Sequence, residues 1–197
     1  GHKFVRYADD CNVYVKSQRA GERVLQALRR VYARLHLVVN EAKTAVGPVW
    51  GRKFLGYSIV RGWAGPPRLV VAEPALAKLR DRLRHLTRRG GGRSLRQIAD
   101  DLRAYVPGWR AYFRLAQSPT VMRDLDRWLR HRLRAVQLVH WRRGRTAYLA
   151  LRQLGAHKDE AQRIASHLRQ WWHTSRLGLN RLLNLAYFDR LGVPKFS

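Results

Sequence analysis

The 197-residue chain carries 40 lysines and arginines against 13 aspartates and glutamates, a formal net charge of +27. So large an excess opposes compactness unless a polyanion neutralises it, and nucleic acid is a better candidate than an anionic membrane. No run of 18 apolar residues is present to span a membrane, and the single cysteine, Cys11, excludes an internal disulfide and a zinc cluster while fitting a reduced, cytoplasmic setting.

The beginning of the chain predicts two strands and a helix. Residues 4–16 contain two short strand-like runs around the adjacent acids Asp9 and Asp10. Apolar residues then recur at helical spacing from Val24 to Leu35. The first residue is glycine rather than methionine and a strand pattern begins almost at once, so we expect a fragment of a longer protein, cut on its N-terminal side.

Three further strand-like runs follow this helix. The short apolar run 37–39, which Asn40 ends, predicts a third strand. Residues 54–60 predict another strand, and 69–71 can pair with it across a loop of glycine and proline. The order strand, strand, helix, strand and hairpin is typical of half of a split α+β sheet.

From Pro74 onward the pattern is helical. One face of the first helix carries the leucines Leu76, Leu79, Leu83 and Leu86. The opposite face carries the arginines Arg80, Arg82, Arg84, Arg88 and Arg89. The glycine triplet 90–92 ends this helix.

Capping signals predict two longer helices after the triplet. Ser94 followed by Gln97 is a capping box that starts the first, which the pair Pro107-Gly108 interrupts. Ser118 and Pro119 are an N-cap and a first helical residue for the second. The remaining predicted elements are the end of that helix near Trp141, a charged loop over 142–145, and short helices near 146–154, 158–173 and 179–190.

The excess of positive charge is greater in the helical part. Residues 1–60 carry 11 basic and 4 acidic residues, whereas residues 61–197 carry 29 and 9. Charged helix faces are commonly just solvated, but here the acids are too few to balance the bases, which favours a nucleic-acid-binding face. The candidates for phosphate contacts are Arg80, Arg84, Arg88, Arg89, Arg130, Arg134, Arg142, Arg143 and Arg145.

Aromatic residues accompany these arginines, and aromatic rings in a basic groove can stack on bases. Trp109, Tyr112 and Phe113 lie at one-face helical spacing, which favours packing in the core. The adjacent Trp171 and Trp172 cannot both face the core, so we expect one of them at the surface or at a boundary.

The pair Asp9-Asp10 admits two interpretations. Adjacent acids are common in hairpin turns, and a turn needs no further function. Alternatively, carboxylates at the tip of a strand hairpin suit Mg²⁺, which prefers carboxylate and phosphate oxygens. Two such ions can clamp the attacking and leaving oxygens of phosphoryl transfer.

Several short motifs occur in one order along the chain. Tyr-Ala-Asp-Asp at 7–10 resembles the active-site hairpin of reverse transcriptases. The segment 35–44 resembles the stretch after the palm helix, and Phe-Leu-Gly-Tyr at 54–57 resembles the primer-grip hairpin. Gly-Trp and Tyr-Phe within 108–113 resemble the start of a maturase thumb signature that continues over 125–192. Nearly the whole chain thus resembles a group II intron-encoded reverse transcriptase/maturase.

The resemblance implies roles for individual residues. Asp9 would coordinate the catalytic Mg²⁺ ions of the complete enzyme, and Asp10 would sit beside it and support the metal site. Tyr7 would pack near the primer end, and Lys43 would lie near the incoming nucleotide or the leaving pyrophosphate. The primer-grip residues would be Phe54, Leu55, Gly56 and Tyr57. An ordinary buried strand is the other interpretation of this last segment, and the two can hold together.

The resemblance also implies a domain organisation. Residues 1–73 would be the C-terminal part of a palm, with antiparallel strands, a helix and both hairpins. Residues 74–197 would be an all-α, basic thumb/maturase domain. The family places another metal-binding aspartate and the fingers before the first hairpin, and this chain does not include them. We therefore expect that it does not polymerise DNA alone.

We expect the chain to bind group II intron RNA and to assist splicing, while its parent performs RNA-directed DNA synthesis on a DNA primer or target. Two alternatives stay open. One is a polymerase half that becomes active with a separate N-terminal reverse transcriptase chain. The other is a basic protein that binds any nucleic acid.

Overall fold

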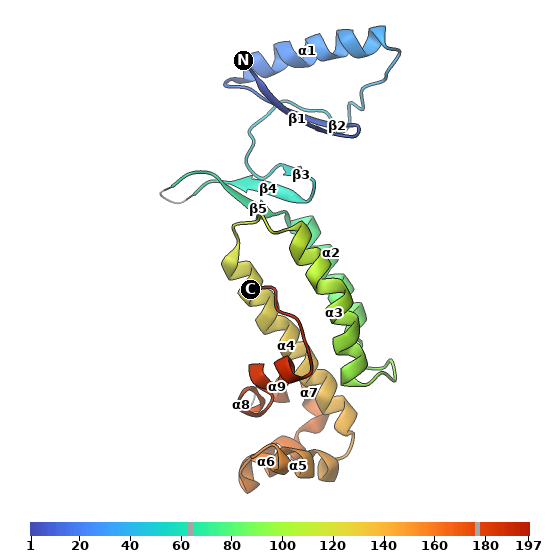
Figure 1. The fold of residues 1–197 in the computed structure, drawn as a ribbon, viewed down its shortest axis with the longest axis vertical. Coiled ribbons are helices and arrows are strands. Elements are labelled where there is room, and N and C mark those ends of the chain that lie inside the picture. Colours follow the sequence, from blue (N-terminus) through green and yellow to red (C-terminus); the bar gives the residue numbers. More distant parts are fainter. Residues whose placement is uncertain (63–64, 176–177) are drawn as a thin grey trace. The chain divides into compact units, whose positions relative to one another are not determined.

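The computed structural model describes residues 1–62, 65–175 and 178–197 (Figure 1). The chain separates into two compact units, Gly1–Arg52 and Lys53–Ser197. Small antiparallel sheets come first and mostly helices follow, which confirms a mixed α+β fold. The assignment of residues 1–73 to a palm, and the boundary at 73/74, stay predictions.

The first unit contains the hairpin that carries the two aspartates. Strands β1 (Lys3–Tyr7) and β2 (Asp10–Tyr14) pair antiparallel, with Tyr7 opposite Asp10. Ala8, with φ of 52°, and Asp9 form the two-residue turn, and a positive φ is what tight hairpin turns require. The predicted pair of strands around the acids is therefore confirmed.

Helix α1 (Gln18–Arg34) follows the hairpin, as the apolar spacing predicts. The Ser17 hydroxyl caps it by accepting a hydrogen bond from the Ala20 amide at 3.2 Å. The predicted strand over 37–39 is wrong. A strand needs a neighbour to pair with its backbone, and no segment of the described chain pairs with this run, so Val38 is left 97% exposed.

The second unit begins with a three-stranded sheet. Its strands are β3 (Lys53–Phe54), β4 (Tyr57–Val60) and β5 (Arg68–Val71), in that order. The predicted pairing of 69–71 with the preceding strand is confirmed. The single strand predicted over 54–60 is instead a hairpin, because Leu55 and Gly56 both adopt positive φ, 50° and 77°, and form a two-residue turn.

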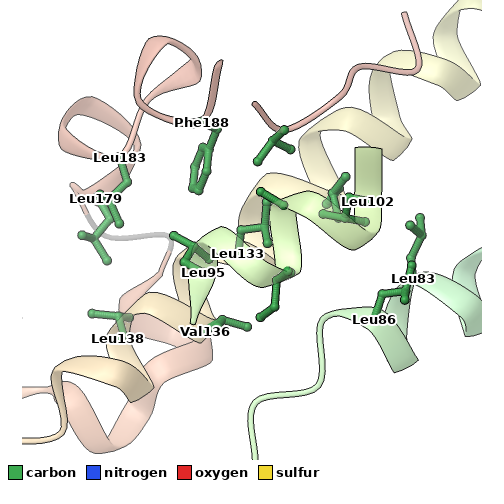
Figure 2. Close-up of a cluster of buried hydrophobic side chains, with 14 of the residues drawn as sticks. Leu83, Leu86, Leu95, Leu102, Leu133, Val136, Leu138, Leu179, Leu183 and Phe188 are labelled. Carbon is green, nitrogen blue, oxygen red and sulfur yellow. The ribbon is translucent and has the colours of Figure 1, made fainter. Parts of the chain in front are cut away.

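Three long helices build the centre of the second unit: α2 (Glu73–Leu86), α3 (Leu95–Tyr112) and α4 (Pro119–Trp141). All four leucines predicted to share one face of α2 are buried, at 5% exposure or less. Figure 2 shows leucines of α2, α3 and α4 meeting Leu179, Leu183 and Phe188 in one apolar cluster. Burial of these apolar side chains drives the folding of the unit.

Helix α3 begins as predicted but does not break as predicted. Ser94 and Gln97 form the capping box, with reciprocal hydrogen bonds of 3.2 and 2.8 Å. The expected interruption at Pro107-Gly108 is wrong, since the helix runs through both residues. A proline removes one helical hydrogen bond but its φ suits a helix, and the buried side chains of Val106 and Phe113 on either side keep the chain helical.

The end of the chain divides into shorter elements than predicted. They are α5 (Gly144–Gln153), α6 (Lys158–Ser166), the 3₁₀ turn η1 (Leu168–Gln170), α7 (Trp171–Thr174), α8 (Leu179–Leu182) and α9 (Leu185–Arg190). The charged loop expected over 142–145 shortens to Arg142 and Arg143, because α5 starts at Gly144. Within the described ranges, no helix is both long enough and apolar enough to cross a membrane.

Candidate nucleic-acid interface

Three arginines and two tryptophans gather where the end of α2 lies against α4 and α7. We call Arg84, Arg89, Trp128, Arg132 and Trp171 the arginine–tryptophan cluster. Trp128 and Arg132 are four residues apart on α4 and so share one face of that helix. Arg84 lies in the last turn of α2, and Trp171 starts α7.

The guanidinium groups of this cluster lie over the indole rings. The central carbon of Arg89 is 3.2 Å from the centroid of the Trp171 ring. Arg84 and Arg132 share Trp128, with their central carbons 5.7 and 5.3 Å from its centroid. Such cation–π contacts stabilise the arginines in fixed planes without neutralising their charge.

Hydrogen bonds hold Arg132 at the centre of the cluster. Its Nε donates to the Thr87 hydroxyl at 2.7 Å, and its Nη2 donates to the Arg84 carbonyl at 3.3 Å. The Thr87 hydroxyl in turn donates to the Leu83 carbonyl at 2.6 Å. Arg132 is therefore positioned by the Thr87 hydroxyl and the backbone at the end of α2 rather than by an acid.

The electrostatics of the cluster leave its positive charge largely unbalanced. Burial, followed by the charges of Arg89 and Arg84, lowers the pKa of Arg132, and burial lowers the pKa of Arg89. Arg84 pairs with Asp81 at 2.5 Å, but neither Arg89 nor Arg132 forms an ion pair with any described carboxylate. A phosphate group would relieve this repulsion, and guanidinium planes and indoles also stack on bases.

The other predicted arginines fall into different environments. Arg80 pairs with Glu73 at 2.7 Å, and Arg88 is exposed. Arg142, Arg143 and Arg145 are exposed around the junction of α4 and α5. These residues stay predicted phosphate contacts.

Arg130 and Arg134 turn inward. Arg130 is only 4% exposed, and its Nη1 donates to Asp126 Oδ1 at 3.0 Å, so we do not keep it among the proposed phosphate contacts. Arg134 donates from Nε to the Leu183 carbonyl at 3.0 Å, and burial together with the charge of Arg130 lowers its pKa to about 10. Both side chains connect α4 to neighbouring segments of the core.

Comparison with known families places this cluster in context. Residues 76–155 match the group II intron, maturase-specific domain. No curated protein matches the chain. The maturase-specific domain contains four members of the cluster, while Trp171 lies after it. The resemblance seen in the sequence is confirmed over this region, and the match implies a maturase role in binding intron RNA.

The aspartate hairpin lies before the maturase-specific domain. Asp9 sits in the turn, Asp10 opens β2, and both are exposed together with Tyr7. Lys43 is exposed after α1. Among the described residues, no group of three or more acidic, histidine or cysteine side chains could hold a metal ion. The two carboxylates suit Mg²⁺ chemically but do not make a two-metal centre by themselves.

The second hairpin is fastened to the end of α3. The Tyr57 hydroxyl donates to the Tyr112 carbonyl at 2.6 Å, and the Tyr112 hydroxyl donates to the Leu55 carbonyl at 3.1 Å. A Cβ on Gly56 would lie 3.0 Å from the Phe113 ring, so the turn needs glycine for contact as well as for its φ. This packing connects the predicted primer-grip segment to the maturase-specific domain.

The aromatic residues of α3 only partly follow the sequence prediction. Phe113 is buried and Trp109 packs against the core, but Tyr112 is 56% exposed and uses its hydroxyl on the hairpin. Trp171 and Trp172 are both half-buried, with their rings edge to face. The sequence analysis missed Arg132, although its spacing of four from Trp128 was visible.

Proposed function

We propose that this chain binds group II intron RNA through the arginine–tryptophan cluster and assists the splicing of that RNA. The observation that supports the proposal is the position of the cluster, since four of its five residues lie in the maturase-specific domain. Unbalanced guanidinium groups held against indoles suit RNA in particular, because unpaired bases are recognised by stacking while phosphates bind the charges.

The Arg89→Ala variant tests this proposal. We expect the wild-type chain to accelerate splicing of a group II intron RNA and Arg89→Ala to lose most of that acceleration, because the variant removes the charge stacked on Trp171. The measurement is the splicing rate with and without protein at fixed Mg²⁺ and salt. Arg96→Ala, which removes an exposed arginine of α3 outside the arginine–tryptophan cluster, is the control and should keep the acceleration. A wild-type chain that leaves the rate unchanged contradicts the proposal.

A second function rests on the aspartate hairpin. We propose that residues 1–73 are the end of a reverse transcriptase palm, so that the parent protein performs RNA-directed DNA synthesis with Mg²⁺. The turn that presents Asp9 next to Asp10 supports this interpretation. In it, this chain would supply carboxylates and the primer-grip segment, and a separate N-terminal chain would supply the rest.

Primer extension in a mixture of chains tests this second function. We expect extension only when the complementing N-terminal reverse transcriptase chain and Mg²⁺ are both present, and its loss in Asp9→Ala. The reason is that a two-metal site loses its clamp on the reacting oxygens when a ligand is removed. Extension by the mixture that persists in Asp9→Ala would assign the metal site to other residues.

A further inference from the structure

The connection between α4 and α5 has an unusual backbone. Arg142 adopts φ 51° and ψ −55°, and the Arg143 amide donates to the Trp141 carbonyl at 2.5 Å. This is a three-residue γ-turn of the rare, strained type. A large side chain with positive φ persists only where the surrounding structure holds it, and such strain is concentrated at functional positions.

An open groove of about 480 Å³ begins at this turn. It lies between the α4–α5 junction and the segment that leaves α6 through η1. The polar residues and glycine that line it are Arg142, Gly144, Ser166, His167, Arg169 and Gln170. A Cβ on Gly144 would lie 3.3 Å from the Ala165 carbonyl, so this glycine lets the first turn of α5 approach α6 closely.

The groove is positive and has no large aromatic ring in its described lining. Arg142 and Arg169 are exposed, neither pairs with a described carboxylate, and no acid is among its described lining residues. The acids at the start of α6 are engaged elsewhere, because Asp159 contacts His157 at 3.5 Å and Glu160 pairs with Arg181. The described lining also contains no tryptophan, tyrosine or phenylalanine, in contrast to the arginine–tryptophan cluster.

We propose that this groove binds a phosphodiester group of the RNA backbone between Arg142 and Arg169. The chemistry fits a phosphate better than a base, because two guanidinium groups offer bidentate donors. The one aromatic ring in the described lining is the His167 imidazole, whose Nδ1 lies 2.9 Å from the Arg163 carbonyl. The strained turn at Arg142 holds its side chain at the groove. The inference rests on the proposed function and adds to it a second RNA contact, outside the arginine–tryptophan cluster.

The variant Arg142→Gly removes the guanidinium charge and relieves the strained φ, so a loss of RNA binding can be told apart from a loss of stability. Glycine adopts positive φ readily, so this variant should unfold at the same or a higher temperature than wild type. Its RNA affinity should nevertheless fall, and the slope of log K against log salt should become less negative by about 0.7 for the phosphate contact that is lost. Arg169→Ala should make the slope less negative by a similar amount. Because Arg169 lies outside the γ-turn, this variant leaves the backbone of that turn unchanged.

The measurement is RNA binding by the full chain over a salt series. Arg163→Ala is the matched control, because it removes one exposed arginine of α6 that does not line the groove, and its slope should stay near wild type. Wild-type slopes in both Arg142→Gly and Arg169→Ala would overturn the proposal. A thermal-unfolding experiment with inorganic phosphate adds a second way to overturn it. If phosphate raised the unfolding temperature of wild type but not of Arg142→Gly and Arg169→Ala, while both variants kept the wild-type RNA slope, the groove would hold free anions only.

The same titrations keep this inference apart from the proposed function. Preference for intron RNA over an unrelated RNA of equal length reports on the proposed function. A change of slope in the groove variants on either RNA reports on the groove. Equal affinity of wild type for the two RNAs would overturn the proposed function. A less negative salt slope in the groove variants, found in the same experiment, would still support the phosphate-binding groove.

Discussion

Replacing Asp126 with alanine is expected to lower the free energy of unfolding by about 3–5 kcal/mol, because it leaves a buried arginine without its counter-charge. Asp126 is 9% exposed and accepts a hydrogen bond from Arg130 Nη1 at 3.0 Å. It also accepts from the backbone amides of Phe196 and Ser197, each at 2.9 Å. One carboxylate thus joins α4 to residues seventy positions later.

Arg130 has little to replace this carboxylate. Its Nε and Nη2 have no hydrogen-bond partner among the described residues, and its Nη2 lies 4.0 Å from Asp189. The loss of the Asp126 carboxylate would leave two amides without their acceptor. It would leave the guanidinium with only the Asp126 backbone carbonyl, at 3.1 Å, and the more distant Asp189. An unpaired buried charge is far more unfavourable than an absent ion pair.

Chemical denaturation measures this effect, and two variants serve as controls. Asp124→Ala removes an exposed acid of the same helix, which pairs with Arg127 at 3.1 Å, and should change stability by no more than about 1 kcal/mol. The double variant Asp126→Leu/Arg130→Met should be more stable than Asp126→Ala, because no buried charge remains. A loss of less than about 1 kcal/mol in Asp126→Ala would show that the Asp126–Arg130 pair does not hold the core together.

Replacing Arg132 with alanine is expected to weaken RNA binding roughly ten- to a hundredfold, the range for hydrogen bonds to a charged group. Burial, followed by the charges of Arg89 and Arg84, lowers the pKa of Arg132, and a phosphate bound beside it would relieve the repulsion from those two charges. The salt dependence of binding should decrease in the same variant, because one charge fewer displaces counterions from the RNA.

Arg132→Lys separates charge from geometry. Lysine keeps the charge but cannot donate as a planar fork to Thr87 and a phosphate together, so its affinity should fall between wild type and Arg132→Ala. Thermal unfolding of both variants serves as the folding control. An unfolding temperature close to that of wild type shows that a loss of RNA affinity does not come from loss of the hydrogen bond to Thr87 and a destabilised fold. Wild-type affinity in Arg132→Ala, with an unchanged salt slope, would remove the cluster from the proposed interface.

The fold could be predicted where local pattern decides the structure. The leucine stripe of α2, the capping box of α3 and the hairpin around Asp9 all depend on neighbouring residues. The failures depend on distant contacts. Pro107 stays helical because of core contacts on both sides, and the 37–39 run stays unpaired although its composition favours a strand.

The candidate site was predictable in kind but not residue by residue. Composition indicated many phosphate-binding arginines, yet it could not separate Arg130 from Arg132. Asp126 and Arg130, four residues apart, have the spacing of an ordinary surface pair on a helix. Their burial follows from the C-terminal segment that returns to Asp126, and such a contact over a long distance leaves no local signal.

The most direct test of an RNA-binding maturase role is the affinity of the full chain for a group II intron RNA and for an unrelated RNA of equal length, across a salt series. We predict tighter binding of the intron RNA that persists at high salt, because a surface that recognises RNA shape retains contacts that do not depend on counterion release. Equal affinities that decrease together as salt rises would contradict it, since polyelectrolyte attraction alone would then explain the binding.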